Sequence, residues 1–239
     1  NLGAGNQRLA ERAAGSSFVV VALLSVVLTI IGLEFLNPIL RLFGASDNVL
    51  PYARDYLSVI IAGSFFFAFA VSGNNIVRSE GNARVAMISM MVGACTNIVL
   101  DPIFIFGLHM GIRGAAIATV LANVCAFSYL TLYFLSGKSM LRIRWADVRP
   151  YAAILPEMFA IGSSSFTRVA AGSMLAIVLN NSIVYYGSDM HLAILGVLNR
   201  VFLFFFMPLF GLAQGFQPIA GFNYGAGRYD RVLRVFIRG

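Results

Sequence analysis

The stretch Asn97-Ile-Val-Leu-Asp101-Pro102-Ile-Phe-Ile-Phe-Gly107 places a carboxylate inside a strongly apolar part of the chain. It belongs to an apolar run over about residues 85–108, which is long enough to cross a bilayer as one helix. An aspartate inside such a run costs about 2.5–3.5 kcal/mol on insertion scales, so it should face a protein interior or a wet cavity. The run therefore predicts a membrane-spanning helix that carries an acid with a function.

Two neighbours of Asp101 add to this interpretation. Asn97 lies four residues earlier and therefore on the same helical face. Pro102 lacks a backbone donor and disfavours α geometry at the preceding residue, so it predicts a kink beside the carboxylate. Together they predict a place for a proton or a small cation. The alternative is simple hydration, because Asp101 lies about 25 Å along the helix from Arg84, nearer one interface than the middle.

The composition indicates a polytopic, all-α membrane protein. Of the residues, 59% are hydrophobic and 11% are charged, and the mean hydropathy is +0.83. A soluble domain of 239 residues needs far more polar surface. The net charge of +7 does not indicate nucleic acid as a partner, because Lys and Arg lie in short segments between apolar runs without aromatic interleaving.

Cysteine and histidine give no support for metal or redox chemistry. Cys95 and Cys125 lie inside apolar runs and are typical of small buried hydrophobic residues. His109 and His191 fall in expected loops without a second ligand at metal-binding spacing. We therefore expect no metal and no cofactor, and we do not expect an enzyme.

Six apolar segments predict six membrane spans. They cover about residues 13–40, 52–77, 85–108, 114–135, 155–186 and 192–222. The last two are long enough to tilt or to extend past the membrane. The basic stretch between the fourth and fifth segments contains Trp145 and predicts an interfacial linker between two helical bundles.

The basic residues predict that both ends of the chain lie on the cytoplasmic side. In this orientation twelve basic residues are cytoplasmic: Arg8, Arg12, Arg78, Arg84, Lys138, Arg142, Arg144, Arg149, Arg228, Arg231, Arg234 and Arg238. Three lie in outer loops: Arg41, Arg54 and Arg113. Cytoplasmic loops are enriched in Lys and Arg, so we expect a multi-pass protein of the cytoplasmic membrane with Asp101 toward its outer half.

Glycine patterns indicate an internal repeat and close helix packing. Asn1-Leu-Gly-Ala-Gly5 and Asn223-Tyr-Gly-Ala-Gly227 share four of five residues, and a basic stretch follows each. We expect one period of a repeat, within a protein about twice as long that supplies the missing partner helices. Transporters place their binding sites at such repeat interfaces. The patterns Gly211-Leu-Ala-Gln-Gly215 and Gly114-Ala-Ala-Ile-Ala118 predict tight helix contacts.

Four stretches together resemble the multidrug and toxic compound extrusion (MATE) transporters. They are Asn74-Asn-Ile-Val-Arg78-Ser-Glu-Gly-Asn82, Asn97-Ile-Val-Leu-Asp101-Pro102-Ile-Phe, Gly111-Ile-Arg-Gly-Ala-Ala-Ile-Ala-Thr119, and the stretch from Gly211 to Gly227. The resemblance covers essentially the whole chain and looks like the third to eighth of twelve family helices. It implies two pseudo-symmetric six-helix lobes that rock to give alternating access.

The resemblance also implies a division of the chain and an activity. Residues 1–137 would hold the last four helices of the amino-terminal lobe, and 138–155 would form a basic cytoplasmic linker. Residues 156–239 would hold the first two helices of the other lobe and the start of a third. The implied activity is the export of organic cations and other drugs, driven by exchange for H⁺ or Na⁺, with membrane lipids as surroundings.

The resemblance assigns candidate cation-binding residues to the amino-terminal lobe. The family's fifth-helix Asn and Asp match Asn97 and Asp101, and its sixth-helix Thr matches Thr119. Its fourth-helix Asn aligns with Val71, while Asn74 and Asn75 lie one turn further on. An Asp of the family's first helix would precede the chain. We expect protonation or Na⁺ binding at Asp101, assisted by Asn97 and Thr119, with Asn74 and Asn75 as further candidates.

Candidates for a substrate surface lie on the last two long segments. They are Asn180, Asn181, Tyr185, Arg200 and Phe205, the last within the Phe-rich region 202–206. A row of Phe is also typical of lipid-facing or core packing. Arg168 and Arg200 either pair with an interior carboxylate or extend along their stems to water.

Two other functions remain open at this point. A lipid-linked oligosaccharide flippase of the same superfamily would need arginines clustered in a central cavity, and Arg168 and Arg200 are few. A non-transporting membrane assembly subunit would fold and oligomerise as this six-helix piece.

Overall fold

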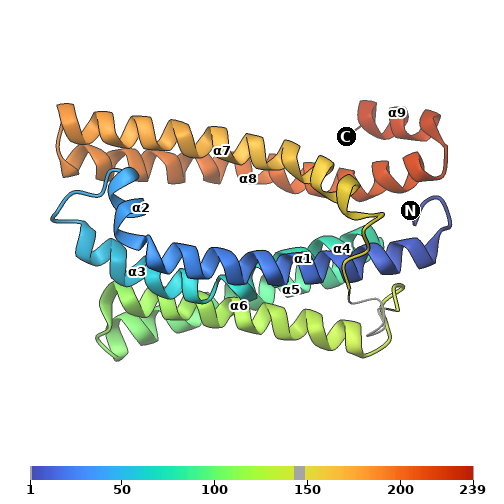
Figure 1. The fold of residues 1–239 in the computed structure, drawn as a ribbon, viewed down its shortest axis with the longest axis horizontal. Helices are drawn as coiled ribbons and strands as arrows, with labels where there is room; N and C mark the ends of the chain where they lie inside the picture. Colours follow the sequence, from blue (N-terminus) through green and yellow to red (C-terminus); the bar gives the residue numbers. More distant parts are fainter. Residues whose placement is uncertain (1, 143–148, 239) are drawn as a thin grey trace.

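The computed structural model describes residues 2–142 and 149–238, and within these ranges the regular elements are helical (Figure 1). Trp145 and the rest of 143–148 lie outside the described residues. The helices are α1 (Gln7–Glu34), α2 (Leu36–Leu42), α3 (Leu50–Ala62), α4 (Ser64–Ser79), α5 (Ala83–Pro102), the π-helical turn η1 (Ile103–Gly107), α6 (Gly111–Leu135), α7 (Leu155–Tyr186), α8 (Asp189–Gly225) and α9 (Tyr229–Arg238). The prediction of an all-α fold is confirmed.

The number of membrane spans also agrees with the sequence. In the described part of the chain five helices are long and apolar enough to cross a membrane: α1, α5 with η1, α6, α7 and α8. The pair α3 and α4 forms a sixth span if it is counted as one bent helix. With 32 and 37 residues, α7 and α8 exceed the ~20 residues that a span needs, as the lengths of the apolar segments predict.

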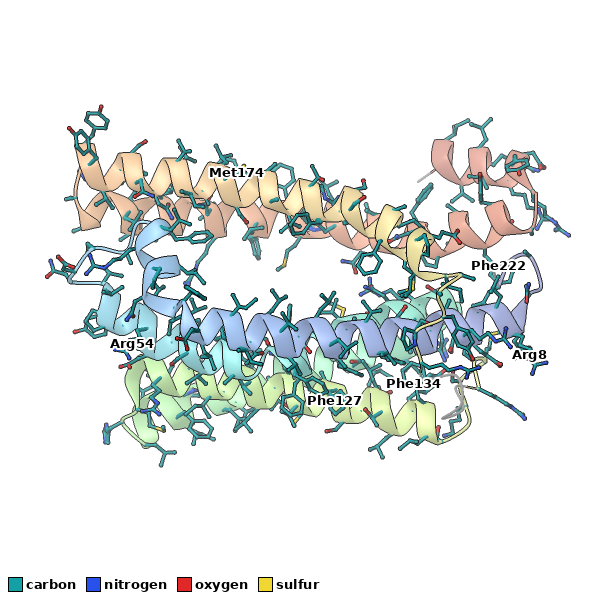
Figure 2. The ribbon with its side chains drawn as sticks, in the orientation of Figure 1. Arg8, Arg54, Phe127, Phe134, Met174 and Phe222 are labelled. Carbon is teal, nitrogen blue, oxygen red and sulfur yellow. The ribbon has the colours of Figure 1, made fainter. Side chains whose placement is uncertain are left out.

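The helices form two layers (Figure 1). The first layer consists of α1, α3, α4, α5, η1 and α6, and the second consists of α7 and α8, which run side by side. At one end α2 rises from the first layer toward the second. The other end holds the start of α1, residues 138–142 and the end of α8, and we call it the linker end. Figure 2 places Arg8 and Phe222 at the linker end and Arg54 at the α2 end.

A bend lies at Gly63, where the sequence predicts an uninterrupted helix. The axes of α3 and α4 differ there by 54°. A Cβ atom on residue 63 would lie 2.4 Å from Cγ2 of Val120, so the glycine lets α6 approach the bend closely. The bend is therefore a packing feature that involves a residue far along the chain.

Pro102 acts differently from the sequence-based prediction. Asp101 stays within α5, and Pro102 itself has helical angles of φ −64° and ψ −31°. The prediction that proline moves Asp101 out of α geometry is therefore wrong. The helix instead widens directly after the proline, where the Leu108 amide donates to the Ile103 carbonyl at 2.8 Å across five residues. A π-helical turn of this kind accommodates an irregular hydrogen-bond ladder without ending the helix.

Small residues decide where helices pack closely. Gly114, Ala118 and Ala122 of α6 are buried, and a Cβ on residue 114 would lie 2.8 Å from the Phe104 carbonyl oxygen. This confirms close packing at the pattern from Gly114 to Ala118. Among the described residues no such contact is found at Gly211 and Gly215, since a Cβ on either would meet no described atom within 4 Å. Both glycines instead line a cavity beside α8.

The two copies of the repeated glycine motif lie against each other at the linker end. A Cβ on Gly3 would lie 2.2 Å from the Phe222 carbonyl oxygen. A Cβ on Gly225 would lie 3.3 Å from the Ala4 nitrogen. The first and second layers therefore touch here through backbone atoms.

The start of the linker is fixed to the first layer by a buried carboxylate. Glu80 accepts hydrogen bonds from the Ser139 hydroxyl, from the Tyr133 hydroxyl at 3.3 Å and from the Met140 amide at 3.4 Å. Gln7 on α1 also donates to the Met140 carbonyl at 2.9 Å. These contacts tie residues 138–142 to the α4–α5 turn and to the start of α1.

Candidate functional site

Asn97, Asp101 and Thr119 form a hydrogen-bonded group between α5 and α6. The Asn97 side-chain amide donates to the Asp101 carboxylate at 3.1 Å and to Thr119 Oγ1 at 3.4 Å. The Thr119 hydroxyl donates to the Ala115 carbonyl at 2.9 Å. All three side chains are half-buried. The group thus brings the carboxylate and hydroxyl oxygens, which are hard ligands of the kind that small cations prefer, to the same amide nitrogen of Asn97.

The packing of α5 on α6 brings this group together. Asn97 and Asp101 are four residues apart on one face of α5, so they meet without tertiary help. Thr119 reaches them because small residues let the two helices approach: a Cβ on Gly93 would lie 3.5 Å from that of Ala126 and 3.6 Å from the Ala122 carbonyl oxygen. Glycine and alanine at facing positions are the usual means of close helix approach in membranes.

A cavity of about 580 Å³ adjoins the group, and we call it the amide cavity. Its polar lining includes four asparagines and a threonine (Asn74, Asn75, Asn97, Asn123 and Thr119), together with Arg78, Ser89 and Gln214. The structure therefore gathers four predicted cation-binding residues around one cavity, and Asp101 adjoins it through its hydrogen bond to Asn97. Asn123 was not predicted, although its position one turn after Thr119 on α6 was a signal for it.

Asn74 and Asn75 differ in their surroundings. Asn74 is buried; its amide donates to the Ala86 carbonyl at 2.8 Å, and its oxygen accepts from Arg78 Nε at 2.8 Å. This side chain thus ties α4 to α5 while it lines the cavity. Asn75 is exposed and lines both the amide cavity and a second cavity beside α1.

The predicted substrate residues lie elsewhere. At the α2 end, Asn180 donates to the Phe43 carbonyl at 3.1 Å and Asn181 donates to the Leu42 carbonyl at 2.9 Å. These bonds connect α7 with the end of α2, where Gly44 packs against Asn180. The two asparagines therefore join the two layers at the end opposite the linker.

The aromatic and charged members of the set are exposed. Tyr185 is 80% exposed and packs edge-on against Tyr186, and Phe205 is 72% exposed and packs against Phe204. Arg168 and Arg200 are exposed, and within residues 2–142 and 149–238 neither forms an ion pair. The structure does not bring these side chains to the amide cavity.

Sequence reasoning missed the partnership of Arg78 and Gln214. The Arg78 guanidinium donates to Asn74 of its own helix and to the side-chain oxygen of Gln214 on α8. Both residues also line the amide cavity. In the sequence Arg78 contributed to membrane orientation and to one of the four stretches that resemble MATE transporters, and its spacing of four from Asn74 was a signal for contact.

Comparison with known proteins identifies the family. The MatE family model matches residues 1–103 and 165–239, which is most of the chain. The chain belongs to the MatE family. Among curated MatE relatives, the "Multidrug export protein MepA" of Staphylococcus aureus (strain NCTC 8325 / PS 47) is 28% identical over 216 residues, 90% of this chain and 48% of the relative. That of Staphylococcus haemolyticus (strain JCSC1435) is 29% identical over 211 residues, 87% and 46%. This MatE chain thus spans about half the length of these relatives.

Solved structures of similar proteins share the MatE fold. An "outward-facing conformation of a multidrug resistance MATE family transporter of the MOP superfamily" is 29% identical, with a TM-score of 0.88 over 98% of this chain and 52% of that one. An inward-facing conformation described in the same words is 29% identical, with a TM-score of 0.82 over 99% and 54%. The resemblance to MATE transporters predicted from the four stretches is confirmed.

Proposed function

We propose that the protein to which this chain belongs exports drugs and other organic cations across the cytoplasmic membrane in exchange for H⁺ or Na⁺. The observation that carries the proposal is the Asn97–Asp101–Thr119 group at the edge of the amide cavity, inside apolar helices of a MatE chain. The names of the relatives, which describe multidrug export, support the same activity. In this proposal the protein is a transporter and not an enzyme.

Asp101 is the residue at which the driving cation acts. A proton or Na⁺ bound there neutralises the carboxylate, and the side chains of Asn97 and Thr119 complete its surroundings. Neutralisation removes the charge that the Asn97 amide faces, so the contact between α5 and α6 changes in strength. The π-helical turn η1 begins two residues later and provides a place where the helix can repack.

The orientation follows from the basic residues. The linker end carries Arg8, Arg12 and Arg142 and is cytoplasmic, so Asp101 lies toward the outer half of the membrane. Residues 1–137 belong to the amino-terminal lobe, 138–155 to the linker and 156–239 to the second lobe. The remaining helices of each lobe come from the rest of the full-length chain.

The test is efflux of a cationic dye from cells that express the complete gene. Wild type and Asp101→Asn are compared under an imposed pH gradient and, separately, under a sodium gradient. Asp47→Asn is the matched control, because the interaction described for Asp47 is an exposed ion pair with Arg41, and such pairs contribute little. We expect loss of efflux in Asp101→Asn, efflux near wild type in the control, and one gradient sufficient for wild type.

Two outcomes would contradict the proposal. Undiminished efflux in Asp101→Asn would show that this carboxylate does not couple transport to the cation. If wild type moves no dye under either gradient, drug export is wrong and the flippase becomes the function to test. The cavities described here offer little support for a large anionic headgroup, since Arg78 is the guanidinium common to their linings.

A further inference from the structure

Arg78 and Gln214 stand where three cavities meet. Both residues line the amide cavity, a cavity of about 550 Å³ beside α1 and a cavity of about 960 Å³ between α4–α5 and α8. We call the last one the inter-layer cavity. A single side-chain hydrogen bond between these residues thus borders every one of these spaces.

The bond is part of a chain of contacts from α5 to α8. Asn74 donates to the Ala86 carbonyl of α5 and accepts from Arg78, so the guanidinium is held at a fixed place on α4. Arg78 Nη1 then donates to the side-chain oxygen of Gln214. The first layer is thereby connected with the second through three side chains.

The partner of Arg78 on α8 is neutral. A guanidinium stays charged at any working pH and usually pairs with a carboxylate in two-point geometry. Here the described acceptors are the amide oxygens of Asn74 and Gln214 and the sulfur of Met90 at 3.8 Å. The nearest carboxylate in sequence, Glu80, is engaged with Ser139, Tyr133 and Met140. The α4–α8 contact is therefore one that can open without separating an ion pair.

A second contact joins the two layers at the linker end. Gly3 packs on the Phe222 carbonyl, so backbone atoms of both layers touch there (Figure 2 shows Phe222 at this end). In the orientation proposed above, this contact and the Arg78–Gln214 bond lie toward the cytoplasmic side.

We propose that Arg78 is a positioning residue that latches α4 to α8 through Gln214 and that the transport cycle must open this latch. The inference rests on the proposed function and deepens it, because it names the contact that separates the amide cavity from the cytoplasmic side. Arg78 and Gln214 line the amide cavity together with Asn97 and Thr119 of the proposed cation site. Opening the latch therefore changes the shape of the cavity that this site adjoins.

The test measures the width of the inter-layer cavity in the full-length protein. The exposed native cysteines Cys95 and Cys125 are replaced by serine, and spin labels are attached to Met87→Cys and Ile219→Cys, on opposite walls of the cavity. Pulsed electron paramagnetic resonance then gives the distance distribution between the labels. Dye efflux and dye binding are measured on the same variants without labels.

Three changes at the latch have distinct expected results. Gln214→Glu turns the bond into an ion pair, so we expect the short distance to dominate and efflux to slow by about 5–10-fold, a typical coupling between sites, while dye binding stays unchanged. Gln214→Leu removes the acceptor and should shift the labels to the long distance. The double variant Arg78→Gln/Gln214→Glu restores a hydrogen bond between one charged and one neutral side chain. It should return the label distances to those of wild type and efflux to within about threefold of wild type.

Asn199→Asp is the matched control, because it adds the same charge to α8 at an exposed residue outside the linings of the three cavities. If it reproduces the effect of Gln214→Glu, charge on α8 acts without the latch and the proposal is overturned. Distances that do not respond to any Gln214 variant overturn it as well. Since the distance measurement needs no transport, failure of the latch is distinguishable from failure of the proposed export, which the Asp101→Asn comparison tests.

Discussion

Replacing Gly3 with alanine should weaken the contact between the loop before α1 and the end of α8. The added Cβ would lie 2.2 Å from the Phe222 carbonyl oxygen and 3.2 Å from the Ala226 nitrogen. Both are backbone atoms, so no side chain can rotate away to make room. The loop or the end of α8 must retreat by at least about 0.8 Å to reach 3.0 Å, the lower limit of real Cβ contacts.

Overpacking of this kind costs about 1–3 kcal/mol. The corresponding drop in the ratio of closed to open linker ends is about 5–150-fold, because about 1.4 kcal/mol is a factor of ten. Gly221→Ala is the matched control, because Gly221 lies on α8 next to Phe222 but a Cβ there meets no described atom within 4 Å. It should be neutral or should stabilise by up to about 1 kcal/mol through helix propensity.

The assay is thermal unfolding of the purified full-length protein in detergent, combined with the spin-label distance across the inter-layer cavity. We expect Gly3→Ala to lower Tm and to lengthen the distance, while Gly221→Ala leaves the distance unchanged and Tm equal or higher. A Gly3→Ala protein with the Tm and distance of wild type would refute the reasoning. It would mean that the two glycine loops do not touch in the folded protein.

Two further predictions concern the linker end. Glu80→Gln keeps the shape of the buried side chain but weakens its charge-assisted bonds, so it should destabilise the linker contact by about 1–2 kcal/mol and speed proteolysis within residues 138–155; an unchanged cleavage rate would contradict this. In α9 a hydrogen bond from Arg234 holds the pKa of the Asp230 carboxyl below its usual value. The pair's contribution to the stability of α9 is therefore fully present above the ordinary aspartate pKa, and it is lost as the pH falls through the lowered pKa. Arg234→Ala should raise the Asp230 pKa in a nuclear magnetic resonance titration, and an unshifted titration would argue against the pairing.

Local sequence patterns were sufficient to predict the membrane spans and the Asn97–Asp101 pair of the candidate site. Asn97 and Asp101 are related by the helical repeat alone, and their apolar surroundings already required an interior or wet location. The facing small residues of α5 and α6 then brought Thr119 to them. These features depend on spacing within one helix or on packing between two consecutive helices, and both can be predicted from the sequence.

The remaining features depend on contacts between distant parts of the chain. Arg78 and Gln214 are 136 residues apart, and no periodicity relates them. The bend at Gly63 depends on where Val120 arrives from α6, and the openness of Gly211 and Gly215 depends on which helices stand beside α8. Pro102 shows that a local pattern can also mislead. A helix can absorb the loss of a backbone donor by a wider turn as well as by a kink, and the sequence does not distinguish the two.

The π-helical turn also bears on how this region tolerates changes in chain length. Its hydrogen bond spans five residues where an α-helix spans four, so Ile103–Gly107 holds one residue more than a regular turn requires. Deleting that residue would leave the spacing of Asn97 and Asp101 unchanged, and the short connection to Gly111, with a positive φ at His109, can absorb the change of phase. Insertions and deletions of one residue should therefore accumulate here during evolution without separating the carboxylate from the threonine on the next helix.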